Sequence, residues 1–156
     1  MQEAIEACPL QGRSAIVTGA GKGLGRAYAL ELARQGARVL VNNRVRRGQP
    51  NSADAVVAEI RAAGGIAEAD YSRVEHETAG ADLVTHALDC FSALDIVVAN
   101  AGTDHPRSFH KQDWGAFEEI FQINFYGTAR LLHAAWPILR RADKGRAVVS
   151  VSSRGR

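Results

Sequence analysis

The 156-residue sequence has little cysteine and no long apolar run. Its two cysteines, Cys8 and Cys90, have no CxxC spacing, which argues against a zinc site or thiol catalysis. No apolar stretch approaches the roughly 20 residues that span a bilayer. Met1–Leu10 carries Glu3 and Glu6 where a secretory signal would be basic. We therefore expect a cytoplasmic protein with no membrane segment and no metal site.

The sequence also has no large excess of charge of either sign. Its 19 basic and 17 acidic residues give a formal net charge of +2, so no whole-molecule field favours nucleic acid or an anionic membrane. Hydrophobic residues make up 46% and charged residues 23%, a balance that is typical of a folded globular chain. The length suits a single domain over residues 1–156.

Short apolar runs alternate with helical patterns along the chain. Strands are predicted at 15–18, 38–42, 66–69, 94–99 and 147–151, and the longest helical region at 114–139. Strands separated by helices favour a parallel sheet that is covered on both faces. The predicted class is α/β, a doubly wound Rossmann-type sheet in three layers, which we expect to be incomplete at its C-terminal end.

The residues between the first strand and the first helix form a glycine turn, Thr18–Gly25. At such a turn, backbone N–H groups and the helix dipole can hold a pyrophosphate. A P-loop is excluded because Ile16 stands at its first glycine and Gly23 at its Ser or Thr. GxGxxG counted from Gly19 also fails, because Leu24 occupies the third glycine position. The spacing that fits is TGxxxGxG.

TGxxxGxG after a first strand resembles the glycine motif of the short-chain dehydrogenase/reductase family. Further features match that family in order: Asn100-Ala101-Gly102 after the fourth strand, Asn124 in the long helix, and Ser152-Ser153 after the fifth strand. The resemblance covers nearly the whole chain. It implies binding of NAD(H) or NADP(H) and hydride transfer between the nicotinamide and a small-molecule carbonyl or alcohol.

A weaker similarity concerns a branch of that family. Gly23–Leu30 and the strand end Val41-Asn42 look like the hydroxyacyl-CoA dehydrogenase domain of peroxisomal multifunctional enzymes and similar bacterial proteins. That branch usually carries Asp where this chain has Asn43.

The resemblance also assigns individual site residues. Those that match cofactor-binding positions are Gly19, Lys22, Gly23, Leu24, Gly25, Asn43, Arg44, Asp70, Asn100, Ala101 and Gly102. Asp70 corresponds to the acidic residue that contacts adenine, although Asp70-Tyr71-Ser72 also aligns one or two positions differently. Ser153 matches the residue that holds the substrate oxygen, and Asn124 matches the one that completes a proton relay.

The end of the second strand favours NADP over NAD. NAD-binding members commonly have an acidic residue there to accept hydrogen bonds from the ribose hydroxyls, whereas this chain has Asn43. Arg44 could pair with a 2′-phosphate through its planar fork, and Lys22 could add a second positive charge. The alternative is that Arg44 belongs to a solvated basic loop.

The family's general acid/base pair, YxxxK, lies downstream of the position that Ser153 occupies. No Tyr in the sequence is followed by Lys four residues later. We therefore expect residues 1–156 alone to bind cofactor without catalysing turnover. The alternative function is a non-catalytic dinucleotide-binding or interaction module.

The long helical region offers a surface for homo-oligomerisation. Family members associate through this helix, here residues 114–139. Phe117, Phe121, Phe125 and Leu132 could form an exposed apolar patch on it.

Overall fold

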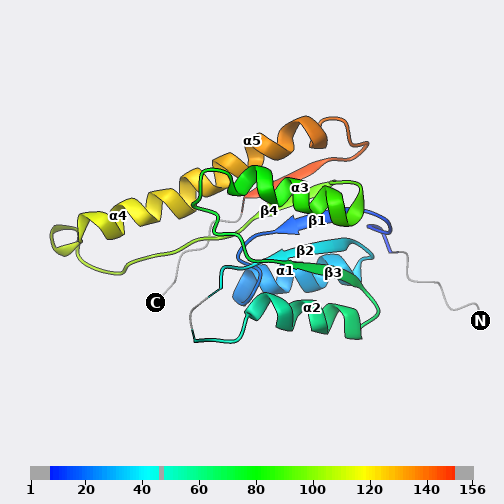
Figure 1. Cartoon of the computed structure of the whole chain (residues 1–156), viewed down its shortest axis with the longest axis horizontal. Coiled ribbons are helices and arrows are strands. Elements are labelled where there is room, and N and C mark those ends of the chain that lie inside the picture. The colour runs from blue at the N-terminus through cyan, green and yellow to red at the C-terminus, as the bar shows by residue number, and fades with distance from the viewer. Residues whose placement is uncertain (1–7, 46–47, 150–156) are drawn as a thin grey trace, which may run out of the picture.

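The computed structural model of the chain describes residues 8–45 and 48–149. At its centre lies a five-stranded sheet in the order β3-β2-β1-β4-β5 (Figure 1). The strands are β1 (Ser14–Val17), β2 (Arg38–Asn42), β3 (Ile66–Asp70), β4 (Ile96–Ala99) and β5 (Arg146–Val149). All four neighbouring pairs are parallel. The predicted Rossmann-type α/β class is confirmed.

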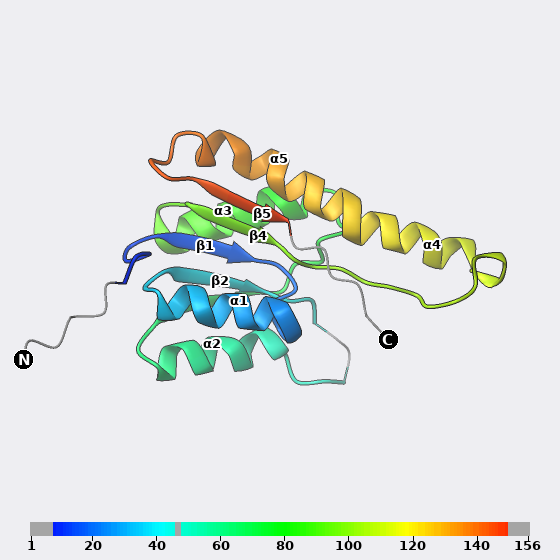
Figure 2. The same ribbon diagram turned by 180° about the vertical axis from the view of Figure 1, so that it is seen from behind.

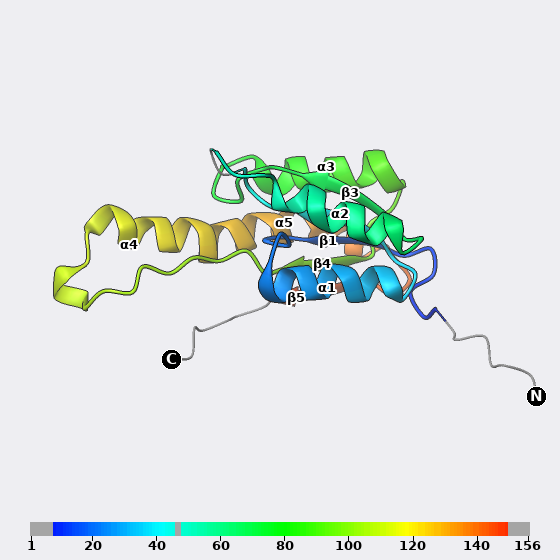
Figure 3. The ribbon, with the colours of Figure 1, turned by 90° about the horizontal axis from the view of Figure 1, so that it is seen from below.

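Helices cover both faces of this sheet. They are α1 (Gly23–Arg34), α2 (Ser52–Ala62), α3 (Ala79–Phe91), α4 (Trp114–Phe121) and α5 (Thr128–Leu139), with a 3₁₀ turn η1 (Phe109–Lys111) and a π-helical segment η2 (Gln122–Gly127). α1 and α2 pack on one face, and α3 and α5 pack on the other (Figure 2, Figure 3).

The alternation of side chains along β1 explains the two cores. Successive strand residues point to opposite faces of a sheet. Ala15 and Val17 pack in one cluster with Ala29 of α1, whereas Ile16 packs in the other with Leu83 of α3. All five of these side chains are fully buried. A strand buried on both faces is a continuous apolar run, which is why the sequence predicted it correctly.

Four predicted strands differ from the observed ones at an end. The third ends at Asp70 instead of 69. The first strand spans Ser14–Val17 instead of 15–18. The fourth begins at Ile96 instead of 94, because Asp95 precedes it with its carboxylate accepting the Ser14 N–H at 3.0 Å. The fifth begins at Arg146 instead of 147, and residues 150–151 of its predicted range lie outside the described residues.

The helix predicted at 114–139 is helical throughout but is not one α-helix. α4 passes into η2 at Gln122, and η2 passes into α5 at Thr128. A π-type segment inside a helix frequently occurs at a functional site. Here it contains Asn124, and Gly127 packs so closely on the loop after β3 that a Cβ would lie 3.0 Å from the Val74 carbonyl oxygen.

α4 and the loop before it extend away from the sheet (Figure 1). Trp114 stacks on Phe117 with 5.3 Å between ring centroids, and Phe121 lies 5.2 Å from the same ring. Phe121 and Phe125 are exposed as predicted. Leu132 is not part of that patch, because it packs against the core between the sheet and the α3–α5 layer.

Candidate functional site

A cavity of about 950 Å³ lies at the carboxyl ends of the strands. Its walls come from the glycine turn, the loops after β2, β3 and β4, and η2. The strand order reverses between β1 and β4, since β2 and β3 lie on one side of β1 and β4 and β5 on the other. Ligands of doubly wound sheets bind in the crevice at this reversal. The cavity therefore occupies the expected ligand position of the fold.

The glycines of the turn have different roles. A Cβ at Gly19 would lie 2.9 Å from the Ala101 Cα, and one at Gly25 would collide with the Asn100 side chain. Both glycines therefore allow the turn to pack against the residues after β4. Gly23 has a φ of +58° and nothing within 4 Å of where a Cβ would stand. Glycine is needed at this position because the backbone has a positive φ, and the absence of a side chain leaves open space beside the cavity.

Gly21 lies on the other side of the turn, against Asn43 and Ser52. A Cβ there would collide with the Ser52 hydroxyl and lie 2.8 Å from the Asn43 side-chain amide. The Asn43 amide donates to that hydroxyl at 2.7 Å. Asn43 thus joins the end of β2 to the first residue of α2 directly beside the turn.

The N-terminus of α1 opens on the cavity. No side chain caps this helix among the described residues, and Lys22 precedes it in extended conformation. The first N–H groups of a helix have no intrahelical acceptor, and together with the helix dipole they favour an anion. Lys22, Gly23, Leu24 and Gly25 all line the cavity. This arrangement fits the pyrophosphate of a dinucleotide.

Thr18 joins the glycine turn to the segment after β4. Its hydroxyl oxygen accepts the N–H groups of Asn100 and Ala101, each at 3.0 Å. The Asn100 amide donates to the Thr18 carbonyl oxygen at 3.0 Å. Asn100, Ala101 and Gly102 all line the cavity, where the sequence predicts them. Thr18 is missing from the predicted site, although it is the first residue of TGxxxGxG.

Asn124 is the one predicted catalytic residue within the described part of the chain. Its amide oxygen accepts the Thr103 N–H at 2.8 Å, and its amide nitrogen donates to the Thr103 carbonyl at 3.0 Å. Both residues line the cavity. Ser153 lies outside the described residues.

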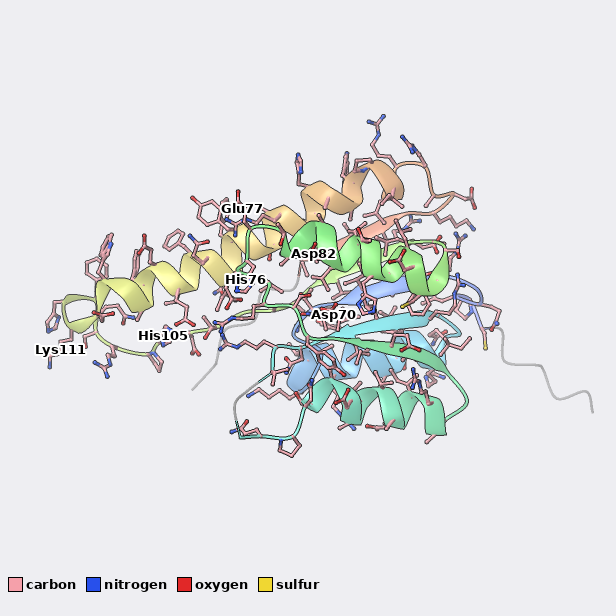
Figure 4. All side chains as sticks on the ribbon, in the orientation of Figure 1. Asp70, His76, Glu77, Asp82, His105 and Lys111 are labelled. Atoms are coloured by element: carbon pink, nitrogen blue, oxygen red, sulfur yellow. The ribbon has the colours of Figure 1, made fainter. Side chains whose placement is uncertain are left out.

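Asp70 is buried at the end of β3 (Figure 4). One carboxylate oxygen accepts from the Asn42 amide and the Ser72 N–H, each at 2.8 Å, and the other lies 2.8 Å from Nδ1 of His86. Burial raises the pKa of this carboxyl, but the hydrogen bonds from His86, Ser72 and Asn42 outweigh it and hold the pKa below 3.8.

The carboxylate of Asp70 is therefore engaged inside the protein. The cavity wall next to it is formed by Ser72 and Val74 and does not include Asp70. Of Asp70, Tyr71 and Ser72, over which the alignment leaves the position open, Ser72 is the one that lines the cavity. Contact between Asp70 and adenine stays a prediction.

Arg44 lines the cavity, but its guanidinium faces carboxylates. Its Nη1 lies 3.8 Å from Glu75 Oε1 and 3.7 Å from Glu119 Oε1. The alternative of a merely solvated loop does not describe this side chain, because it is 31% exposed and ion-paired. Sequence reasoning misses both glutamates, since they belong to the loop after β3 and to α4, far from Arg44 along the chain.

The fold defines a class of protein, the Rossmann-like α/β domains. The defining features are the parallel sheet with its order reversal, the glycine turn after β1 and the uncapped start of α1. None of the described helices is both long and apolar enough to cross a membrane.

Comparison with known proteins gives the family. The family model for short chain dehydrogenases matches residues 13–156. The chain is 44% identical over 151 residues to a short-chain type dehydrogenase/reductase of Mycobacterium tuberculosis, which covers 94% of this chain and 53% of that protein. It is 42% identical over 160 residues to the peroxisomal multifunctional enzyme type 2 of Mus musculus, which covers 96% of this chain and 21% of that enzyme.

Solved structures agree with this assignment. A short chain dehydrogenase from Mycobacterium avium superposes with a TM-score of 0.81 at 39% identity, covering 88% of this chain and 51% of that one. A 7α-hydroxysteroid dehydrogenase in complex with NADH and 7-oxo glycochenodeoxycholic acid gives 0.85 at 28% identity, covering 97% and 57%. The chain belongs to the short-chain dehydrogenase/reductase family. It spans about half the length of the M. tuberculosis relative and of these two structures.

Proposed function

We propose that this chain is the cofactor-binding part of an NAD(P)-dependent oxidoreductase that acts on a small carbonyl or alcohol. The observation that carries the proposal is the uncapped N-terminus of α1 beside the open space at Gly23, at the strand-order reversal. A family member of similar structure is known in complex with NADH. When bound, the nicotinamide supplies the hydride donor or acceptor.

Different residues of the cavity would have different roles in binding and catalysis. The amides of Gly23, Leu24 and Gly25 would hold the pyrophosphate. Asn100–Gly102, fixed by the Thr18 hydroxyl, would form the wall along the cofactor. Asn124 would hold a proton-relay position at η2.

Ser153 is proposed to hold the substrate oxygen. Because no Tyr of residues 1–156 is followed by Lys four positions later, we expect this stretch alone to bind cofactor without turnover. Purified protein incubated with cofactor and a panel of alcohols and ketones tests that expectation. Cofactor-dependent change in absorbance at the nicotinamide band would contradict it.

NADP(H) is the proposed cofactor in preference to NAD(H). Asn43 places an amide, not a carboxylate, beside the glycine turn, so it does not repel a 2′-phosphate. Lys22 is exposed on the cavity wall and can offer positive charge to the phosphate. Arg44 lies next to Asn43 and can do the same only where the phosphate displaces Glu75 and Glu119 from its guanidinium.

Fluorescence titration of NADPH and NADH into the protein tests both parts of the proposal. We expect saturable binding of both, with the lower Kd for NADPH. A lower Kd for NADH would contradict the preference alone. Failure of the folded protein to bind either cofactor would contradict the proposed function.

We also propose that the chain self-associates through residues 114–139. Phe125 is 61% exposed and Trp136 is 56% exposed in this region. Exposed aromatic side chains at this density are typical of association surfaces. The cytoplasmic location stays a prediction, since some similar proteins are named as peroxisomal.

A further inference from the structure

One guanidinium joins three segments at the rim of the cavity. Arg44 follows β2, Glu75 belongs to the loop between β3 and α3, and Glu119 lies on α4. Nη1 of Arg44 is 3.8 Å from the Glu75 carboxylate and 3.7 Å from the Glu119 carboxylate. Arg44 and Glu75 both line the cavity.

Neighbouring groups hold the two carboxylates in place. Arg73 contacts Glu75 at 2.7 Å. His105, on the loop that runs beside α4 (Figure 4), has its Nε2 2.9 Å from Glu119. Burial raises the pKa of Glu75, but hydrogen bonds from its own N–H and from Arg73, with the charges of Arg73 and Arg44, outweigh it and keep the pKa below 4.5. Glu75 is therefore charged at neutral pH.

These contacts oppose the binding of a further anion by Arg44. The formal charges of Arg44 and Arg73 are balanced by those of Glu75 and Glu119. A phosphate monoester carries about −1.5 to −2 charges at pH 7. Such a group at Arg44 would compete with both carboxylates for the guanidinium donors and would be repelled by their charges. A ribose hydroxyl at the same place carries no charge and meets neither effect.

We propose that Glu119 and Glu75 are specificity-determining residues, which weaken binding of the 2′-phosphorylated cofactor by holding Arg44. The inference rests on the proposed function, because it concerns discrimination at the same site. The side chains of Arg44 and Glu119 are 31% and 39% exposed, so the pair is open enough to exchange one anion for another.

Glu119→Gln is the sharpest variant, because it removes one charge and keeps the shape of a partly exposed helix residue. We expect the Kd for NADPH to fall about three- to fivefold, the effect of one partly exposed ion pair, while the Kd for NADH changes less than twofold. Glu118→Gln is the matched control. It removes the same charge from the neighbouring position of α4, and Glu118 makes no ion pair within the described part of the chain.

A second substitution tests whether the effect of Glu119 depends on the guanidinium of Arg44. In an Arg44→Gln background, Glu119→Gln should change the NADPH-to-NADH ratio of Kd values less than it does in the unaltered protein, because only direct repulsion of the phosphate remains when the carboxylate has no Arg44 to hold. Thermal unfolding verifies that each variant is folded. If Glu119→Gln does not fold, Glu119→Asp withdraws the carboxylate from Arg44 and should shift the ratio in the same direction.

Two results overturn the inference alone. One is an unchanged ratio in Glu119→Gln when the unaltered protein binds both cofactors, which leaves the proposed function intact. The other is the same shift in Glu118→Gln, which assigns the effect to the charge of α4 and not to Arg44. If the unaltered, folded protein binds neither cofactor, the proposed function fails and the inference fails with it.

Discussion

The side chain of Asn124 bonds both backbone groups of Thr103, accepting from its N–H at 2.8 Å and donating to its carbonyl at 3.0 Å. The pair joins the π-helical segment to the loop that follows β4. The same loop begins with Asn100, whose amide donates to the Thr18 carbonyl at 3.0 Å. Two asparagines thus fix this wall of the cavity at both of its ends.

Asn124→Ala removes both bonds to Thr103. We expect the free energy of unfolding to fall by about 0.5–1.5 kcal/mol, as for other net losses of intramolecular hydrogen bonds. Cofactor affinity should fall as well, because the loop after β4 lines the cavity. Urea unfolding and cofactor titration measure the two effects. Asn124→Asp keeps the acceptor for the Thr103 N–H, so a loss as large as that of the Ala variant would contradict this account.

Gly23→Ala tests the role of the turn in binding. Both Gly23 and Gly64 have positive φ, +58° and +82°, with nothing within 4 Å of an added Cβ. Ala at either position should therefore cost about 1 kcal/mol of stability through backbone strain. Only the change at Gly23 adds a methyl group beside the cavity, so we expect at least tenfold weaker NADPH binding there. Equal binding by the Gly23→Ala and Gly64→Ala variants would refute the assignment.

The decrease in the free energy of unfolding at acidic pH should depend on Asp70. Its folded-state pKa lies below the ordinary 3.8, so the carboxylate stabilises the fold above pH 3.8 and loses this contribution as the pH falls through the folded value. Asp70→Asn should therefore lower stability at pH 7 and flatten the decline below about pH 4. Urea unfolding between pH 2 and pH 7 measures this decline.

Asp89→Asn is the control for the effect at Asp70. Asp89 is exposed on α3, so its replacement should leave the decrease at acidic pH unchanged. A decline below pH 4 that is as steep in Asp70→Asn as in the unaltered protein would show that the buried network does not carry the effect.

Self-association should depend on Phe125. Sedimentation velocity over a range of protein concentrations should show a reversible dimer or higher oligomer, and Phe125→Ser should weaken it at least tenfold. Ile66→Ser removes an apolar side chain that is 56% exposed on β3, outside residues 114–139, and it should have little effect. A concentration-independent monomer would contradict the proposed surface.

The sequence predicts the sheet and the glycine turn because both depend on neighbouring residues. Runs such as Val39, Leu40 and Val41 identify a buried strand by themselves, and Gly23 has a conformation that few other residues adopt. The exact strand ends depend on tertiary contacts. The carboxylate of Asp95, for example, accepts a hydrogen bond from the Ser14 N–H just before β4 begins.

The parts of the site that sequence reasoning misses depend on contacts between distant segments. Arg44 is identifiable as a basic residue after β2, but its pairing with Glu119 requires α4 to lie over the loop after β2. Asp70 matches an adenine-contacting position in sequence, yet burial and the bond to His86 turn its carboxylate inward. Neither contact can be predicted from a local sequence pattern.

The central claim is that the N-terminus of α1 binds the pyrophosphate of a nicotinamide dinucleotide. Backbone amide NMR during NADPH titration tests it most directly, because it reports on individual N–H groups. We expect the largest saturable shifts at Gly23, Leu24 and Gly25, with smaller shifts at Ala101. Saturable binding that leaves these amides unmoved, or no binding by the folded protein, would contradict it.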